Sequence, residues 1–361
     1  MLDHEYDLLH ERLSADRGGE TRFFVYANTV SARSFSHQQD GQGWMGIRFQ
    51  ANPMAPPNDI IMHVRLLEEE NLKQQEAVGI LGVNLVHGAM EYPDDPHRIL
   101  EELLDGLEPW RAEVGMLRFS GPDFDAVDNR IMALELVQQG HAKATLFNAD
   151  GEVVHPTEVL YHQPIIVERG SFRPVIHTTL HMLQSGMAQF VQEKKVNGEE
   201  VTVLFEMTLQ NLTDSGVIDH QDFLDRVDIL GTVGDQLGED YHVMVSNYAE
   251  YYRLAAYLFR YTKEPIGVVM GLPTLQELFE EKYYSKLEGG ILESFGRMFK
   301  NDLRLYVYPS QGQNGSVSAV ENLQVQKHLQ GLYEYLVGNR FIRPIDDYNE
   351  EIGRASCRER V

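Results

Sequence analysis

Short apolar runs alternate with segments of helical period in the first half of the chain. Apolar runs rich in β-forming residues lie at 21–30, 43–50 and 58–67, which predicts strands. The segment 71–92 repeats apolar residues at helical spacing and predicts a helix. The same patterns predict, in order, a helix at 97–107, a strand at 112–121, a helix at 124–140, two strands around a turn within 143–161, and a strand at 163–174.

From Val175 onward the alternation is cleaner. The runs at 201–209, 241–247, 265–271 and 303–309 are continuously apolar, and continuous runs are typical of parallel strands that are covered on both faces. Helical patterns connect them, at 175–195, 219–237, 248–262, 273–279, 289–302 and 319–339. The sequence therefore predicts an α/β protein whose sheet is mostly parallel, with helices on both faces.

The change of pattern near Val175 suggests two α/β halves. The N-terminal half would comprise residues 1–174, and the C-terminal half, with the parallel sheet, residues 175–350. No Pro/Ser-rich linker separates the halves, so they could also pack as one unit.

The expected carboxyl ends of the strands in the second half carry polar groups. Sheets of this kind bind ligands outside those ends, near a switch in strand order. Glu206, the pair Ser246 and Asn247, and Gly271 lie there, which suits a polar ligand. An alternative for Ser246 and Asn247 is that they cap the helix that follows.

A cluster of anion-binding residue types follows the strand at 163–174. Arg169, Ser171 and Arg173 surround Gly170, and two guanidinium groups with a hydroxyl can hold a phosphate or a carboxylate in fixed geometry. The alternative is that these arginines pair with Glu168 and other carboxylates of an acidic chain.

Two weaker candidates involve glycine and histidine. Gly289 and Gly290 precede an expected helix, where bare backbone N–H groups can hold a phosphate, but a turn that needs positive φ explains them equally well. His177 and His181 have the i, i+4 spacing that zinc accepts, but Thr178 stands where a metalloprotease needs its glutamate. Ordinary capping or core histidines are the simpler interpretation, and we expect no metal.

Charge narrows the class of partner. The 361-residue chain has a formal net charge of −24 and no long Lys/Arg run, so we expect it to bind neither nucleic acid nor a membrane surface. Its start resembles no signal peptide, and no apolar run reaches the roughly 18 residues that span a bilayer. We therefore expect a soluble, cytoplasmic protein.

A family resemblance rests on several linked stretches, including "RFFVYANTVSARSF", "PTEVLYHQPIIVERGSFRP" and "SNYAEYYRLAAYLFRYTKEPIGVVMG". The chain resembles an uncharacterised bacterial protein family whose members carry inconsistent labels, among them TonB-dependent receptor and nicotinate-nucleotide adenylyltransferase. An α/β chain without a signal peptide does not fit the receptor label. The second label is compatible with an α/β fold, but its nucleotide-binding motif is missing, so no catalytic residue is assigned.

Two hypotheses follow. The first is an enzyme, or a former enzyme, that binds a phosphorylated or carboxylated small metabolite at the strand ends. The second is a non-catalytic scaffold or regulatory protein that uses the aromatic residues of 248–261 to contact protein partners. No motif specifies a reaction, a cofactor or an oligomeric state.

The last eleven residues, 351–361, differ from the rest of the chain in carrying three arginines and the single cysteine, Cys357. With suitable codons this segment corresponds to the start of a widely used sequencing adapter. We expect it to be derived from a reagent, in which case the natural portion contains no cysteine and its own C-terminus lies beyond residue 350.

Overall fold

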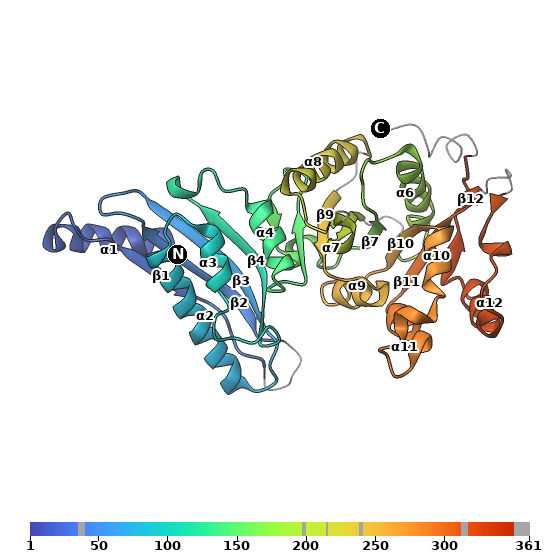
Figure 1. Cartoon of the computed structure of the whole chain (residues 1–361), viewed down its shortest axis with the longest axis horizontal. Helices are drawn as coiled ribbons and strands as arrows, with labels where there is room; N and C mark the ends of the chain where they lie inside the picture. The colour runs from blue at the N-terminus through green and yellow to red at the C-terminus, as the bar shows by residue number, and fades with distance from the viewer. Residues whose placement is uncertain (35–39, 197–199, 214–215, 238–240, 312–316, 350–361) are drawn as a thin grey trace. The chain divides into compact units, whose positions relative to one another are not determined.

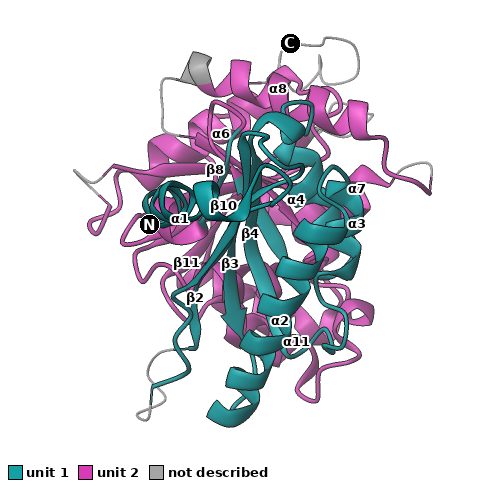
Figure 2. Ribbon diagram, turned by 90° about the vertical axis from the view of Figure 1, so that its left-hand side faces the viewer, with its two compact units in different colours: residues 1–146, 152–155 teal, residues 147–151, 156–361 magenta. Residues whose placement is uncertain are grey.

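The computed structural model describes residues 1–34, 40–196, 200–213, 216–237, 241–311 and 317–349. The chain forms two compact units (Figure 2): unit 1 comprises Met1–Leu146 with Glu152–His155, and unit 2 comprises Phe147–Gly151 with Pro156–Val361. The change of sequence pattern at Val175 lies inside unit 2. The segment 351–361 lies outside the described residues.

Unit 1 is built on an antiparallel sheet with the strand order β1-β2-β3-β4 (Figure 1). The strands are β1 (Phe24–Asn28), β2 (Gln42–Gln50), β3 (Pro57–Leu66) and β4 (Ala112–Ser120). Its helices are α1 (Leu2–Arg17), α2 (Asn71–Glu91), α3 (Pro96–Glu102) and α4 (Asn129–Gln138), with the 3-10 turn η1 (Pro122–Phe124).

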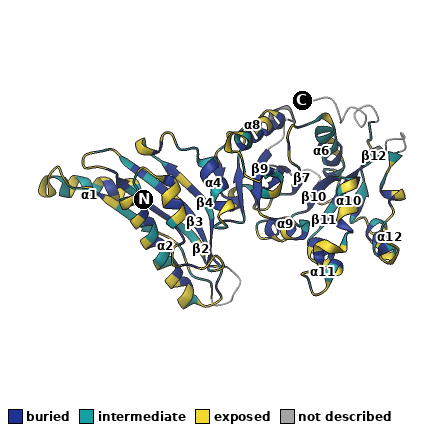
Figure 3. Cartoon of the chain, in the orientation of Figure 1, coloured by how far each residue is buried: buried dark blue, intermediate teal, exposed yellow. Residues whose placement is uncertain are grey.

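Helix α2 packs on one face of the unit 1 sheet. Its buried residues Ala77, Leu81 and Leu85 recur about one helical turn apart, and they give the helix an apolar stripe. On the strands, Ile47 and Ile60 pair with each other and are fully buried. Successive strand residues point to opposite faces, and some residues of these strands remain exposed. The strands of unit 1 are therefore less uniformly buried than those of unit 2 (Figure 3).

Unit 2 contains six parallel strands in the order β14-β11-β10-β7-β8-β9. They are β7 (Ile165–Arg169), β8 (Thr202–Thr208), β9 (Tyr241–Ser246), β10 (Ile266–Gly271), β11 (Leu303–Tyr308) and β14 (Ile342–Pro344). Numbered along the chain, this is the order 3-2-1-4-5-6 of doubly wound dinucleotide-binding folds. Every residue of β8 and β9 is buried, as the continuous apolar runs predicted.

Helices connect these strands. They are α6 (His177–Phe190), α7 (Leu209–Leu212), α8 (His220–Leu237), α9 (Tyr251–Leu258), α10 (Leu272–Leu278), α11 (Gly290–Met298) and α12 (Gln330–Gly338). Shorter elements are α5 (Pro156–Leu160), η2 (Glu281–Tyr284), β12 (Ser310–Gln311), β13 (Val317–Ser318), η3 (Val320–Asn322) and η4 (Lys327–Leu329). Strands β5 (Ala144–Phe147) and β6 (Val153–Val154) flank a turn, Asn148–Gly151, as the sequence predicted, but the second strand is short and α5 takes the place of its predicted continuation.

Further features differ from the sequence prediction. The helix expected at 319–339 forms only in its C-terminal part, because the chain makes two 3-10 turns before α12 begins at Gln330. The strand β14 was not predicted, since three residues are too few to show a pattern. In addition, the parallel pairing expected for the chain is found in unit 2, whereas the sheet of unit 1 is antiparallel. Among the helices that the structure describes, none is long and apolar enough to cross a membrane.

Candidate functional site

The strand order of unit 2 creates a switch point between β7 and β10. From β7 the chain proceeds through β8 to β9 on one side, and from β10 through β11 to β14 on the other. The loops after β7 and β10 therefore leave their neighbouring strand ends in opposite directions, and doubly wound sheets bind ligands outside the strand ends at such a point. Arg169 and Gly271 are the last residues of the two strands.

An ion pair lies on one face of the sheet at this edge. Arg169 and Glu206 are direct neighbours in the register of β7 and β8, so their side chains lie on the same face. The guanidinium group donates to both carboxylate oxygens of Glu206, with the Nη2 to Oε1 distance at 2.9 Å. The hydroxyl of Ser246 donates to the same Oε1 at 2.5 Å. Because Glu206 and Ser246 are fully buried, this carboxylate is satisfied inside the protein.

Arg169 uses its remaining donors on the loop after β9. It donates to the backbone oxygen of Tyr248 at 2.9 Å and to that of Ala249 at 2.8 Å. Its guanidinium carbon also lies 4.2 Å from the ring centroid of Tyr251, a cation–π contact. Burial raises the pKa of Tyr251 to about 12, so that phenol stays neutral. Arg169 thus fastens β7, β8 and the start of α9 together.

The other arginine of the predicted cluster has a different carboxylate partner. Nε of Arg173 lies 3.0 Å from Oδ1 of Asp222, and the Arg173 side chain is 55% exposed. The turn between the arginines passes through Phe172, whose φ of 47° breaks the alternation of the strand. Arg169 and Arg173 therefore bind separate carboxylates. Ser171, between them, is exposed.

A third arginine, which sequence reasoning missed, holds this turn in place. Arg226 of α8 is buried and donates to the backbone oxygens of Ser171 at 2.9 Å and of Asn211 at 3.1 Å. It also binds Asp222 at the i, i+4 position. A paired Asp and Arg four residues apart within an apolar-periodic helix was the available signal.

Helix α6 begins directly after this turn. Its N-cap residue, Ile176, supplies no side-chain hydrogen bond to the first turn. His177 at this end is exposed. His181 lies one turn later, with its Nδ1 at 3.0 Å from the hydroxyl of Tyr308 and 3.4 Å from that of Ser185. Within the described residues no group of three or more metal-ligating side chains exists.

A second buried carboxyl lies on the opposite face of β7. Glu168 precedes Arg169 and pairs in register with Phe205 and Val269. It is 1% exposed, and its Oε2 has no hydrogen-bond partner within the part of the chain that the structure describes. Burial raises the pKa of Glu168 well above its usual range, because a buried carboxyl group favours its uncharged, protonated form. The sequence suggested Glu168 only as a possible partner of arginine and not as a site residue.

The remaining sequence candidates serve local structure. Gly271 is the N-cap of α10, and Asn247 is exposed after β9. The N–H of Gly289 donates to Oε2 of Glu293 at 2.8 Å, and Gly290 has a φ of 52°. These two glycines thus make the turn that starts α11, and the carboxylate of Glu293 occupies the N–H group that a phosphate would need.

The aromatic residues of 248–261 were the basis of the scaffold hypothesis. Four of them, Tyr248, Tyr252, Tyr257 and Phe259, are at most 8% exposed. They belong to the core between α9 and its neighbours, and α9 packs against α11. These four side chains therefore do not contribute to an exposed aromatic surface.

Comparisons of the whole chain with family models, with curated proteins and with solved structures find no match. The function of the edge of the unit 2 sheet is therefore inferred from its geometry.

Proposed function

We propose that unit 2 binds a phosphorylated or carboxylated small metabolite, of the nucleotide type, outside the carboxyl ends of β7 and β10. The observation that carries the proposal is the strand order β14-β11-β10-β7-β8-β9 with all neighbours parallel. In doubly wound sheets of this order the ligand lies at the switch point, with its phosphate at the turn after the first strand. That turn here is 170–176.

Helices on both faces of the sheet are part of this proposal. Parallel crossovers are right-handed in nearly all proteins. The strand order then places α6 and α8 over one face and α9, α11 and α12 over the other, because the chain reverses its direction across the sheet after β9. Packing of α9 against α11 supports this arrangement.

The first turn of α6 is the group that would hold the anion. A helix N-terminus carries a partial positive charge, and the N–H groups of its first turn point toward a ligand. The exposed hydroxyl of Ser171 could add a hydrogen bond. Arg173 could add a charge, because its ion pair with Asp222 is half-exposed and such pairs contribute little free energy. Arg169 would instead position the turn through Glu206, since most of its donors bind Glu206 and the backbone oxygens of Tyr248 and Ala249.

The test is a thermal-shift and calorimetric screen of the full chain with nucleoside phosphates, the matching nucleosides and simple dicarboxylates. A ligand at about 100 times its Kd stabilises the folded state by about 2.7 kcal/mol. We expect Thr179→Glu to abolish this stabilisation. Thr179 is the third residue of α6, where a carboxylate favours the helix but repels an anionic ligand.

Gln184→Glu is the matched control, because it adds the same charge to an exposed position in the middle of the same helix. It should retain ligand binding. If no phosphorylated or carboxylated compound stabilises the protein, or if Thr179→Glu binds as well as Gln184→Glu, the proposal is wrong.

A further inference from the structure

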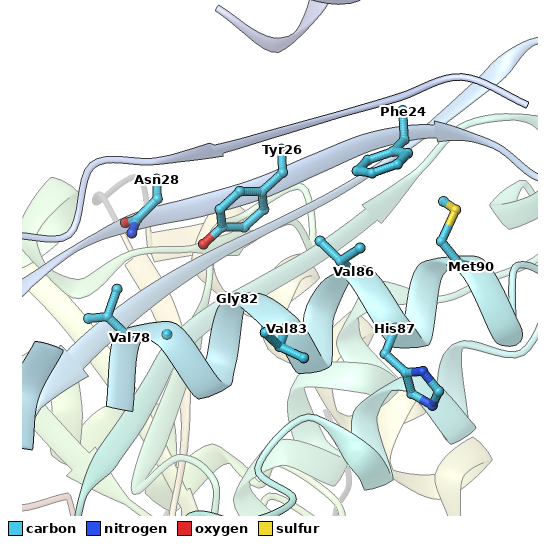
Figure 4. A pocket seen from close by; sticks show the side chains of 10 residues that line it. Phe24, Tyr26, Asn28, Val78, Gly82, Val83, Val86, His87 and Met90 are labelled. Carbon is cyan, nitrogen blue, oxygen red and sulfur yellow. The ribbon is translucent and has the colours of Figure 1, made fainter. Parts of the chain in front are cut away.

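A concave apolar surface in unit 1 lies between β1 and α2. It has a volume of about 700 Å³. Figure 4 shows the side chains of Phe24, Tyr26 and Asn28 extending from β1 toward α2. Val83 and Val86 of α2 form part of its opposite wall. We call this surface the β1–α2 groove. Phe24 is 41% exposed and Val83 is 68% exposed, so large apolar groups face solvent here.

The backbone of β1 has an open edge beside this groove. Within the described residues β1 pairs with β2 alone. Backbone groups of Phe23 and Thr29 bind β2: the Phe23 oxygen accepts from Gln50, and the Thr29 N–H donates to the oxygen of Trp44. In an antiparallel pair such residues alternate, so Phe24, Tyr26 and Asn28 direct their N–H and C=O groups outward. The same three residues line the groove.

Two glycines of α2, Gly79 and Gly82, line the groove. A Cβ on Gly82 would stand 2.6 Å from the hydroxyl of Tyr26, so glycine is needed there for the tyrosine ring to approach the helix. A Cβ on Gly79 would meet no atom within 4 Å. The space beside Gly79 is therefore open to a side chain of a bound ligand.

Charge indicates what kind of partner fits. Unit 1 contains 25 Asp and Glu residues and 12 Lys and Arg residues, a formal charge of −13. The residues that line the groove carry no Asp, Glu, Lys or Arg. The acidic Glu91 directly follows the lining residue Met90, and Glu102 lies 3.7 Å from His87, which also lines the groove. Arg22 stands at the same end but donates to the backbone oxygens of Ala51 and Met90.

We propose that the β1–α2 groove binds an extended peptide segment of another protein, with apolar residues at alternate positions and basic residues on either side. The backbone of the segment adds to the edge of β1 as a fifth strand of the sheet, which supplies affinity, and its alternate side chains enter the groove, which supplies selectivity. The basic residues complement the acidic unit around it. A second copy of this chain is disfavoured, because two acidic units would repel each other.

The test uses a display library of random peptides of about nine residues, the length of a long strand, selected against the full chain. We expect the enriched peptides to share alternating apolar residues with Lys or Arg at the ends. One of them is then synthesised, and its affinity is measured by calorimetry. Gly79→Leu should weaken this binding at least about tenfold, because the new side chain fills the groove without a clash.

The matched control is Gly296→Leu in α11, where a Cβ also meets nothing within 4 Å. Both substitutions replace an open helical glycine by a good helix former, so both variants should fold, and Gly296→Leu should bind the peptide normally. Hydrogen exchange should also slow at the amide of Tyr26 when the peptide binds.

Three results would overturn the proposal. They are enrichment of no peptide or of acidic peptides, equal binding by the Gly79→Leu and Gly296→Leu variants, and a dimer of the chain that Gly79→Leu abolishes. The last result would assign the groove to a second copy. The proposal is independent of the ligand site in unit 2, so a Thr179→Glu variant should bind the peptide with unchanged affinity.

Discussion

Glu206 and Glu168 lie in neighbouring strands of the unit 2 sheet, and both are buried, yet they differ in every contact. Glu206 accepts from Arg169 and Ser246. Glu168 faces the other side of the sheet, and its Oε2 has no partner in the described part of the chain. Neighbouring positions of the strands thus separate a face with a fully paired carboxylate from a face where burial raises the pKa of a carboxyl group. Burial alone therefore does not decide the state of a carboxyl group; its partners do.

The largest effect is expected from breaking the paired face. Arg169→Met leaves the carboxylate of Glu206 buried without its counter-charge, which typically costs 3–5 kcal/mol of unfolding free energy. Urea denaturation of the wild type and the variant measures this loss. A loss below about 1 kcal/mol would mean that the pair contributes no more than a surface ion pair.

The double variant Arg169→Met/Glu206→Leu separates the value of the pair from the cost of one unpaired charge. Replacing both members by apolar residues removes the buried charge altogether, so most of the stability should return. Ser246 then loses its acceptor, at a cost of about 1 kcal/mol. If the double variant is as unstable as Arg169→Met, the instability comes from lost packing rather than from the unpaired carboxylate.

Sequence patterns predicted where the strands of unit 2 lie in the chain but not which strands are adjacent in the sheet. Continuous apolar runs such as 201–209 identify a buried parallel strand, but nothing in a run of valine and leucine states which strand lies beside it. The strand order, and with it the switch point, comes from the structure. In unit 1 the sequence predicted strands near those observed, but their antiparallel pairing was not predicted, since short apolar runs fit either arrangement.

The two arginines of the predicted cluster do not share one binding partner, which the sequence could not show. Arg169 and Arg173 are close in sequence, which suggested a shared anion. Strand β7 comes to its end between the two arginines, and the chain then turns through Phe172, which has a positive φ. The two guanidinium groups therefore bind different carboxylates. Their partners, Glu206 and Asp222, are separated from them by many residues. A single sequence contains no signal for such distant pairs.

A smaller effect, with a defined pH dependence, is expected on the face that carries Glu168. The pKa of Glu168 is raised in the folded state, so below the unfolded value of about 4.3 both states are protonated. As pH rises above that value, the unfolded state loses the proton and the folded state keeps it, and stability falls by up to about 1.4 kcal/mol per pH unit. Glu168→Gln should therefore be more stable than the wild type at pH 7.

The advantage of Glu168→Gln should shrink toward zero as the pH approaches 4. Denaturation of both proteins between pH 4 and pH 8 measures it. The difference between the two curves is needed, because other groups titrate in the opposite sense: burial lowers the pKa of His63 to about 4 and that of His155 to about 3. Those histidines make both proteins less stable as the pH falls below about 6.5. A pH-independent difference would show that Glu168 is not a proton-holding group.

The smallest effect is expected at Arg173, and it completes the comparison of the two arginines. Its ion pair with Asp222 is half-exposed, so Arg173→Ala should cost about 0.2–1 kcal/mol. Asp222 keeps Arg226 as a partner, with the Nε to Oδ2 distance at 2.9 Å, which leaves no unpaired charge behind. Arg297→Ala is the matched control, because Arg297 is 56% exposed and pairs with Glu293. If the two variants are equally stable and only Arg173→Ala responds more weakly to anionic ligands, Arg173 is a residue retained for binding. If Arg173→Ala loses more than about 2 kcal/mol of unfolding free energy, Arg173 is a structural residue like Arg169.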